Sequence, residues 1–237
     1  NGVLTVFLNA AGRPIGGLRS LTSLDGDLVR LQVLAAENLP YRLGIAKGFV
    51  LGKLRNMAVL LRRFESDRGT AAADRIDSLA EVLHEVVEID QLLGTEGAAT
   101  AAYFEAFPSL LPDWCGFQQR NRRPPTDPAN AALGFAYSLL TGAATGAVVA
   151  ARLEPAIGFL HSTDGDRPSL ALDLMEEFRP LLADQVVLEA FRKGSLSQEH
   201  FTTGDEPGSV YLTSDGRRVV IGAYEERVHQ PFRYRPM

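Results

Sequence analysis

Apolar residues recur at spacings of three and four along much of the chain, which is the pattern of helices that bury one face. The pattern begins with residues 28–39 and continues through residues 42–63. A further apolar stripe consists of Leu79, Val82, Leu83, Val86, Ile89 and Leu93. That stripe predicts a helix starting at Asp74 or Asp77, with residues 67–74 as the connection before it. These spacings predict a mainly helical protein.

Glycine, proline and small residues divide the middle of the chain. Gly94 is a suitable helix stop, so we expect a new helix over residues 96–107 with Glu96 in its first turn. Residues 108–128 are rich in Pro, Asp and Arg and are expected to form a loop. Small apolar residues fill 129–153, which predicts a pair of deeply buried helices.

Two short segments have a strand pattern instead. Residues 2–18 predict a hairpin around a Gly-Arg-Pro turn, and residues 210–222 predict a second hairpin with an Asp-Gly turn at 215–216. One hairpin is too small to be a domain. We therefore expect residues 1–24 to be the last hairpin of a largely absent N-terminal β domain, followed by an α-helical domain over residues 25–237.

Composition places the chain among cytoplasmic globular proteins. Hydrophobic residues make up 46% of its 237 residues, which is enough for a sizeable core. The single cysteine, Cys115, has no partner for an internal disulfide, which fits a reducing cytoplasm. No signal peptide is visible, and apolar stretches such as residues 143–151 are too short to span a bilayer, so no membrane association is expected.

The net charge of −5 argues against nucleic acid as a partner, but the charge is uneven. Residues 42–63 carry six basic residues and no acid: Arg42, Lys47, Lys53, Arg55, Arg62 and Arg63. A basic surface of this kind can bind phosphates while the rest of the protein stays acidic.

Four residues are candidate metal ligands, and three of them lie close together in the second half of the chain. Asp173 and Glu176 are three residues apart and share a helix face, with His161 shortly before them and Glu96 on an earlier helix. Carboxylates with a neutral imidazole suit Mn²⁺ or Mg²⁺. On spacing alone, a solvated acidic face and a packed histidine are the commoner explanation.

Two other motifs carry less chemistry. His84 and Glu88 share a helix face as in zinc proteases, but the second histidine of that motif is missing, so we interpret them as a polar face. Cys115 follows Trp114 and has no recognisable base beside it, which favours a packing role.

Three sequence blocks resemble the CRISPR-associated adaptation integrase, a metal-dependent endonuclease that inserts new spacers into CRISPR arrays. They are "GTEGAATAAYF" at 94–104, "NRRPPTDPANAALGFAYSLL" at 121–140 and "EPAIGFLHSTDGDRPSLALDLMEEFRP" at 154–180. Their order and separation also match the family, and the third block is highly specific. The resemblance implies a helical catalytic domain that joins the 3′-hydroxyl of a short prespacer DNA to the CRISPR repeat by transesterification.

The resemblance also assigns roles to residues. It implies that Glu96, His161 and Glu176 bind a Mg²⁺ or Mn²⁺ ion and that Asp173 is a nearby catalytic acid. The implied DNA contacts come from Lys53, Arg55, Arg62, Arg63, Arg120, Arg122 and Arg123. Family members usually carry a complete β domain and further C-terminal helices, which this sequence does not show.

Partners and alternatives follow from the same resemblance. It implies prespacer and repeat DNA as substrates, a small ferredoxin-like adaptation protein as partner, a homodimer, and the prokaryotic cytoplasm as location. Two other functions stay open: a structure-specific, metal-dependent nuclease of branched DNA, and a non-catalytic DNA-binding scaffold.

Overall fold

Helices make up most of the described chain, so the expectation of a mostly α fold is confirmed. The structure is a computed structural model that describes residues 5–9, 14–18, 25–121, 124–161, 165 and 167–231. The α-helices are α1 Gly26–Glu37, α2 Leu39–Arg63, α3 Asp67–Glu81, α4 Ile89–Ala106, α5 Pro128–Ala150, α6 Ser169–Phe178, α7 Gln185–Arg192 and α8 Ser214–His229. Short 3-10 turns are Val82–Glu85, Phe107–Leu110, Asp113–Cys115 and Gln198–His200, and Arg179–Asp184 forms a π-helical turn.

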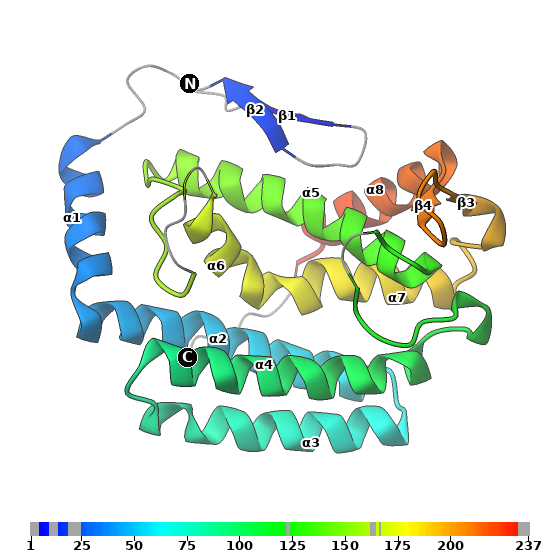
Figure 1. Cartoon of the computed structure of the whole chain (residues 1–237), viewed down its shortest axis with the longest axis horizontal. Coiled ribbons are helices and arrows are strands. Elements are labelled where there is room, and N and C mark those ends of the chain that lie inside the picture. Colours follow the sequence, from blue (N-terminus) through cyan, green and yellow to red (C-terminus); the bar gives the residue numbers. More distant parts are fainter. Residues whose placement is uncertain are drawn as a thin grey trace.

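In the described residues, strands occur as two small antiparallel pairs. Thr5–Leu8 (β1) pairs with Pro14–Leu18 (β2), as predicted for the first hairpin, and this pair lies against α5 (Figure 1). The second pair joins Phe201–Thr203 (β3) and Val210–Leu212 (β4). A small sheet near the C-terminus was expected, but its strands differ from the prediction.

The Asp-Gly sequence at 215–216 lies in the first turn of a helix and makes no hairpin turn. The side chain of Thr213 caps α8 by accepting a hydrogen bond from the backbone N–H of Gly216 at 3.1 Å. Asp215 follows in the first turn, where the helix dipole favours a carboxylate. The predicted second strand of this hairpin is therefore wrong, because helix capping outweighs the turn preference of Asp-Gly.

Several predicted helix boundaries are also wrong. The apolar stripe from Leu79 to Leu93 is not one helix, because α3 ends at Glu81, a 3-10 turn follows and α4 begins at Ile89. The connection expected at 67–74 belongs to α3, because Ser66 caps the helix through the N–H of Gly69 at 2.9 Å and alanines follow. Gly94 does not end a helix but lies inside α4, so Glu96 is beyond the first turn. A glycine in a helix interior costs about 1 kcal/mol, which burial of residues such as Leu92 and Tyr103 outweighs.

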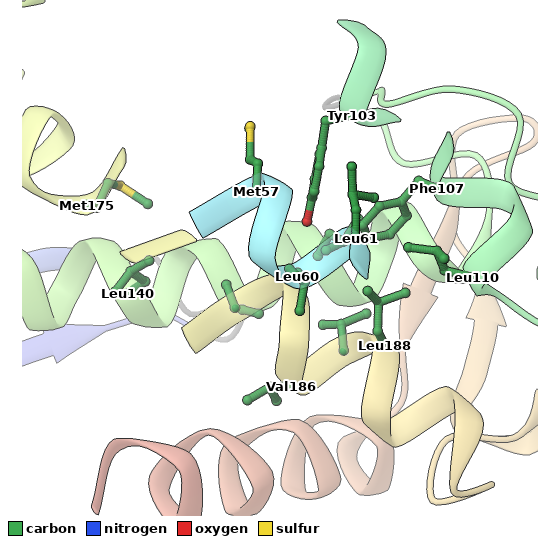
Figure 2. Packing of buried hydrophobic residues seen from close by; sticks show 14 of the residues in the cluster. Met57, Leu60, Leu61, Tyr103, Phe107, Leu110, Leu140, Met175, Val186 and Leu188 are labelled. Carbon is green, nitrogen blue, oxygen red and sulfur yellow. The ribbon is translucent and has the colours of Figure 1, made fainter. Parts of the chain in front are cut away.

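Helix α2 lies at the centre of the helical body. It packs against α3 and α4 on one side and against α6 on the other, and α5 packs on α6 (Figure 1). Figure 2 shows that α2, α4, α5, α6 and α7 all contribute to one hydrophobic cluster. Leu61 of α2, Tyr103 of α4 and Met175 of α6 are almost completely buried in it. A polar side chain on α2 can therefore meet groups from both α4 and α6.

Helix α5 is a single helix of 23 residues, where a pair of helices was expected. Its length and composition would allow it to cross a membrane, contrary to the expectation that every apolar stretch is too short. This is weak evidence, because the core helix of a globular protein meets the same criteria. Buried residues occur from Ala129 to Val148, and the helix packs against α6, α7 and α8.

Candidate active site

The loop before α6 carries His161 and is fixed from outside by two polar side chains. Gln32 of α1 is buried, donates to the carbonyl oxygens of Glu154 and Ile157 at 2.9 Å, and accepts from the backbone N–H of Glu154 at 2.9 Å. Arg42 of α2 donates through Nε to the carbonyl oxygen of Phe159 at 2.8 Å. These bonds satisfy buried backbone groups and hold the loop against the first two helices.

Asp173 of α6 fixes the same loop from inside. Its carboxylate is fully buried, and Oδ2 accepts from the N–H groups of Phe159 at 2.6 Å and Leu160 at 2.9 Å. Oδ1 accepts from the N–H of His161 at 2.9 Å and lies 2.6 Å from Nδ1 of the same residue. A carboxylate oxygen at this distance accepts the proton of Nδ1, so in the neutral imidazole the lone pair is on Nε2.

A glycine allows the loop to approach Asp173 this closely. A Cβ on Gly158 would lie 2.8 Å from Cβ of Ser169 and 2.9 Å from Oδ2 of Asp173. It would also lie 2.9 Å from the carbonyl oxygen of His161. These distances are too short for carbon, so a side chain here would push the loop away from α6.

Glu96 and Glu176 arrive on different helices and meet at one cation. Nζ of Lys53, on α2 between them, lies 2.7 Å from Oε2 of Glu176 and directly contacts Oε1 of Glu96. Thr100 donates to the same oxygen of Glu96 at 2.8 Å. Glu176 Oε2 is buried and has this charge contact but no well-aligned hydrogen bond.

Two further features set the position and charge of Glu176. Gly52, next to Lys53 on α2, leaves room for the Glu177 side chain, which would lie 2.7 Å from a Cβ there, so α6 can approach α2 closely. Burial acts to raise the pKa of Glu176, but the positive charges of Arg179 and Lys53 outweigh it, and the pKa lies below its usual value. Arg179 contacts the other oxygen, Oε1, at 3.1 Å.

The three predicted ligands do not form a metal cluster in this arrangement. Among the described residues, no three His, Cys, Asp or Glu side chains converge as a metal site would require. Glu96 and Glu176 do converge, but on the ammonium of Lys53, and the Nδ1 side of His161 faces Asp173. Two carboxylates already gathered on a cation and an imidazole with Nε2 available are a donor set that suits Mn²⁺ or Mg²⁺.

Lys53 does not lie on the basic surface predicted for DNA. It is only 3% exposed, because it belongs to the apolar stripe of α2 with Val50, Leu54 and Met57. That stripe, visible as a three-and-four spacing around Lys53, is the sequence signal that could have shown its direction.

Three other basic residues of α2, Arg55, Arg62 and Arg63, are exposed, but they are not equally available for a DNA phosphate. Arg62 donates to Asp74 and Asp77 of α3 at 2.7 Å each, and these bonds raise its pKa. Arg63 lies 3.5 Å from Glu189 of α7. Arg55 is exposed and makes no ion pair with the acids that the structure describes. The predicted DNA contacts of α2 therefore depend most on Arg55.

Arg120, predicted to contact DNA, is directed into the protein. It donates to Oδ1 of Asn130 at 2.6 Å and to the carbonyl oxygen of Asn121, and its guanidinium lies 5.2 Å from the ring centre of Tyr137. It therefore fastens the loop to the start of α5. Arg122 and Arg123 lie outside the described residues, so their predicted DNA contacts stay predictions.

A buried polar group behind Arg179 was missed by the sequence analysis. Asp184 accepts hydrogen bonds from the hydroxyls of Tyr103 at 2.9 Å and Tyr137 at 2.7 Å. The guanidinium of Arg179 lies 5.0 Å from the ring centre of Tyr137. Burial raises the pKa of Asp184 to about 6 despite these hydrogen bonds. The three groups come from α4, α5 and the turn after α6, so no local sequence pattern joins them.

Cys115 has the packing role that was predicted, but His84 and Glu88 do not share a helix face, because the 3-10 turn of His84 ends at Glu85 and α4 begins only after Glu88. Cys115 is 1% exposed, and burial raises the pKa of its thiol to about 12, so a thiolate nucleophile is disfavoured. His84 lies on an exposed 3-10 turn, with its Nδ1 2.7 Å from the carbonyl oxygen of Glu81.

Comparison with known sequences gives one family. The sequence pattern of the family described as "CRISPR associated protein Cas1" matches residues 1–226. CRISPR-associated endonuclease Cas1 1 of Thermus thermophilus is 45% identical over 194 residues, which cover 82% of this chain. The match covers 58% of the Thermus protein, so the chain spans little more than half the length of that relative.

Comparison with solved structures agrees with the comparison of sequences. A CAS1 protein from Thermotoga maritima superposes with a TM-score of 0.85 at 27% identity, covering 96% of this chain and 72% of the other. A casposase bound to its integration product superposes with a TM-score of 0.87 at 25% identity, covering 99% of this chain and 66% of the casposase.

Proposed function

This chain belongs to the Cas1 family of CRISPR-associated proteins, and on that basis we propose that it is a metal-dependent DNA integrase and endonuclease of spacer acquisition. The reaction joins the 3′-hydroxyl of a short prespacer DNA to a phosphodiester of the CRISPR repeat. One P–O bond forms as another breaks, and the proton of the attacking hydroxyl passes to the leaving oxygen. The number of phosphodiester bonds is unchanged, so no energy source is needed.

One observation carries this proposal. Asp173 holds both the loop backbone and the Nδ1 side of His161, while Glu96 of α4 and Glu176 of α6 are gathered on one cation. A packing histidine or a solvated acidic face requires neither feature. Buried carboxylates that share a cation are the kind of costly arrangement that proteins keep at functional sites.

The residues of the chain take distinct parts in this reaction. Glu96, Glu176 and Nε2 of His161 would hold the divalent ion, which when bound supplies neutralisation of the phosphate and activation of the attacking hydroxyl. Asp173 keeps the proton on Nδ1 of His161 and fixes the orientation of the ring. Arg179 neutralises the second oxygen of Glu176. Phosphoryl transfer needs little else from a protein than positioning and charge.

The proposed DNA substrates and partners rest on the family. The relatives are named endonucleases, and the casposase was solved with an integration product, which favours joining over cutting alone. Exposed Arg55 gives α2 a cation for a DNA phosphate. We further propose a small ferredoxin-like adaptation protein as partner, a homodimer, and action in the prokaryotic cytoplasm. Size-exclusion chromatography with light scattering, alone and with that partner, tests the two assemblies.

The test of the reaction is a strand-transfer assay. The protein is incubated with a supercoiled plasmid carrying the repeat and a labelled short duplex, with Mn²⁺ and then with EDTA. Label joined to the plasmid only with Mn²⁺ supports the proposal. Cleaved but unjoined DNA would instead support a structure-specific nuclease, and DNA binding without any product would support a scaffold.

Variants connect this activity to the site. Glu96→Gln, His161→Ala and Glu176→Gln should each remove most strand transfer while DNA affinity changes little. Their effects should not add, since residues that act as a unit lose most of their function at the first change. Lys47→Met is a suitable control, because Lys47 lies on α2 away from the two carboxylates and donates to the carbonyl oxygen of His84 at 3.0 Å. Full activity in all three site variants would remove these residues from the reaction.

A further inference from the structure

Lys53 occupies a position that is unusual for a lysine. Its side chain is 3% exposed, and its ammonium group lies between Glu96 of α4 and Glu176 of α6. Lysine is rarely buried unless it is paired. Here it is paired twice, by carboxylates from two different helices that both pack on α2.

The three charged groups depend on each other. Without Lys53, the carboxylates of Glu96 and Glu176 would face each other with less positive charge near them. Without the carboxylates, the ammonium group would be buried and unpaired. Removing one member of such a group leaves an uncompensated buried charge, which strongly destabilises the folded state.

The same two carboxylates are the proposed metal ligands, so a divalent ion and the ammonium group compete for them. We propose that Lys53 is a built-in counter-ion that fills the cation position between Glu96 and Glu176 in the metal-free protein, and that a divalent ion binds by displacing it. This inference rests on the proposed function for the presence of a metal. It adds that metal binding is an exchange of one cation for another.

The surrounding groups suit such an exchange. Arg179 stays on Oε1 of Glu176, which leaves Oε2, the oxygen on Lys53, for the incoming ion. The side chain of Glu96 is 20% exposed and that of Glu176 is 5% exposed, so the ion enters from the Glu96 side. Lysine has a flexible four-carbon side chain, which lets the ammonium group withdraw without movement of α2.

The exchange predicts opposite effects of one substitution on stability and on metal affinity. Lys53→Met keeps an apolar side chain of similar length but removes the competing charge. In the absence of metal, the variant should melt at a lower temperature than the wild type. It should bind Mn²⁺ about tenfold more tightly, equivalent to about 1.4 kcal/mol, and Mn²⁺ should raise its melting temperature more than that of the wild type.

The measurements use Mn²⁺ alone, by calorimetry and by the loss of the free-ion signal in electron paramagnetic resonance. Lys47→Met is the matched control on the same helix and should behave as the wild type. Mn²⁺ affinity that is equal or lower in Lys53→Met than in the wild type would overturn the exchange while leaving the metal site in place. Absence of Mn²⁺ binding in every protein would instead overturn the metal site, and the exchange with it.

A second measurement needs no variant and applies if Lys53→Met does not fold. In the wild type, an amine-specific reagent should modify Lys53 slowly, because its ammonium group is buried and paired. Mn²⁺ should speed the modification of Lys53, followed by mass spectrometry, and leave that of Lys47 unchanged. An unchanged or slower reaction of Lys53 on saturation with Mn²⁺ would overturn the proposal.

Discussion

Oδ1 of Asp173 lies 2.6 Å from Nδ1 of His161, and the same carboxylate holds three backbone N–H groups of the loop that carries this histidine. Asp173 thus determines both where the imidazole lies and which ring nitrogen is protonated. The sequence resemblance made it a catalytic acid beside the metal. Its complete burial and full set of hydrogen bonds make it a positioning residue.

Asp173→Asn tests this role. An amide keeps one acceptor oxygen and places an NH₂ group against N–H donors, so about two buried donors lose their partner. The loss is about 2–5 kcal/mol in the free energy of unfolding, or roughly 5–15 °C in melting temperature. Glu176→Gln should lose strand transfer and should also melt at a lower temperature, because Lys53 and Arg179 lose a charged partner. Thermal unfolding beside strand transfer checks both, and equal stability of Asp173→Asn and wild type would contradict the positioning role.

Gln32 also positions the loop that carries His161, and its removal should have a milder effect than that of Asp173. It makes three hydrogen bonds to the loop from α1, all of them with backbone groups of Glu154 and Ile157. Gln32→Ala should therefore loosen the loop and lower activity severalfold through the position of His161, while Glu96 and Glu176 keep their contacts with Lys53. Faster amide hydrogen exchange in residues 154–161 with unchanged exchange in α4 is the expected result. Protection lost equally across the whole chain would indicate general destabilisation instead.

The sequence predicted the residues of the candidate site better than the orientation of the residues around them. Asp173 and Glu176 could be placed on one helix face from their spacing, and the match to a known family joined them to His161 and Glu96. The direction of Lys53 was misjudged because a run of basic residues indicates charge but not which residue faces the core. The apolar neighbours Val50 and Leu54 were the informative signal.

The ends of helices were less predictable than the site residues, and the reason is physical. Gly94 and Asp215-Gly216 have strong local preferences, yet each lies in a helix. A local preference amounts to about 1 kcal/mol, and burial of one large side chain such as Tyr103 outweighs it. The pair of tyrosines on Asp184 had no local signal at all, because the contact exists only once α4, α5 and the turn after α6 have packed.

Arg55 and Arg62 should differ in their contribution to DNA affinity. They lie on the same face of α2, seven residues apart, but Arg62 is already paired with Asp74 and Asp77. Arg55→Ala should reduce the slope of log affinity against log salt by about 0.9, the loss of one phosphate contact, and Arg62→Ala should reduce it less. Duplex binding between low and moderate salt measures both slopes. A larger effect of Arg62→Ala would reverse this assignment.

Cys115 should be chemically inert. Its thiol is buried and its pKa is about 12, so almost no thiolate is present at neutral pH. Alkylation by iodoacetamide should be slow in the folded protein and fast in denaturant, and Cys115→Ser should keep strand-transfer activity. Rapid alkylation of the folded protein would show that the loop around Trp114 opens.

Asp184 should make the protein more stable as the pH falls from neutral toward 4. Its pKa in the folded state is about 6, above the ordinary value of 3.8, because burial disfavours the charged form. Between these two values the folded state binds the proton and the unfolded state does not, so stability rises with acidification. The difference corresponds to about 3 kcal/mol. Above pH 6 the carboxylate is charged in both states, and this contribution is absent.

Other acids act in the opposite direction, so the effect of Asp184 must be isolated by a variant. The pKa of Glu176 is lowered, and its contribution to stability is lost as the pH falls. Asp184→Asn removes the titrating group but keeps an acceptor for a tyrosine hydroxyl. The difference in unfolding free energy between wild type and Asp184→Asn, measured in denaturant from pH 7 to pH 4, should increase in favour of the wild type. Tyr103→Phe removes one donor to the carboxylate and should move the increase to higher pH, whereas a difference that stays constant with pH would mean that Asp184 has an ordinary pKa.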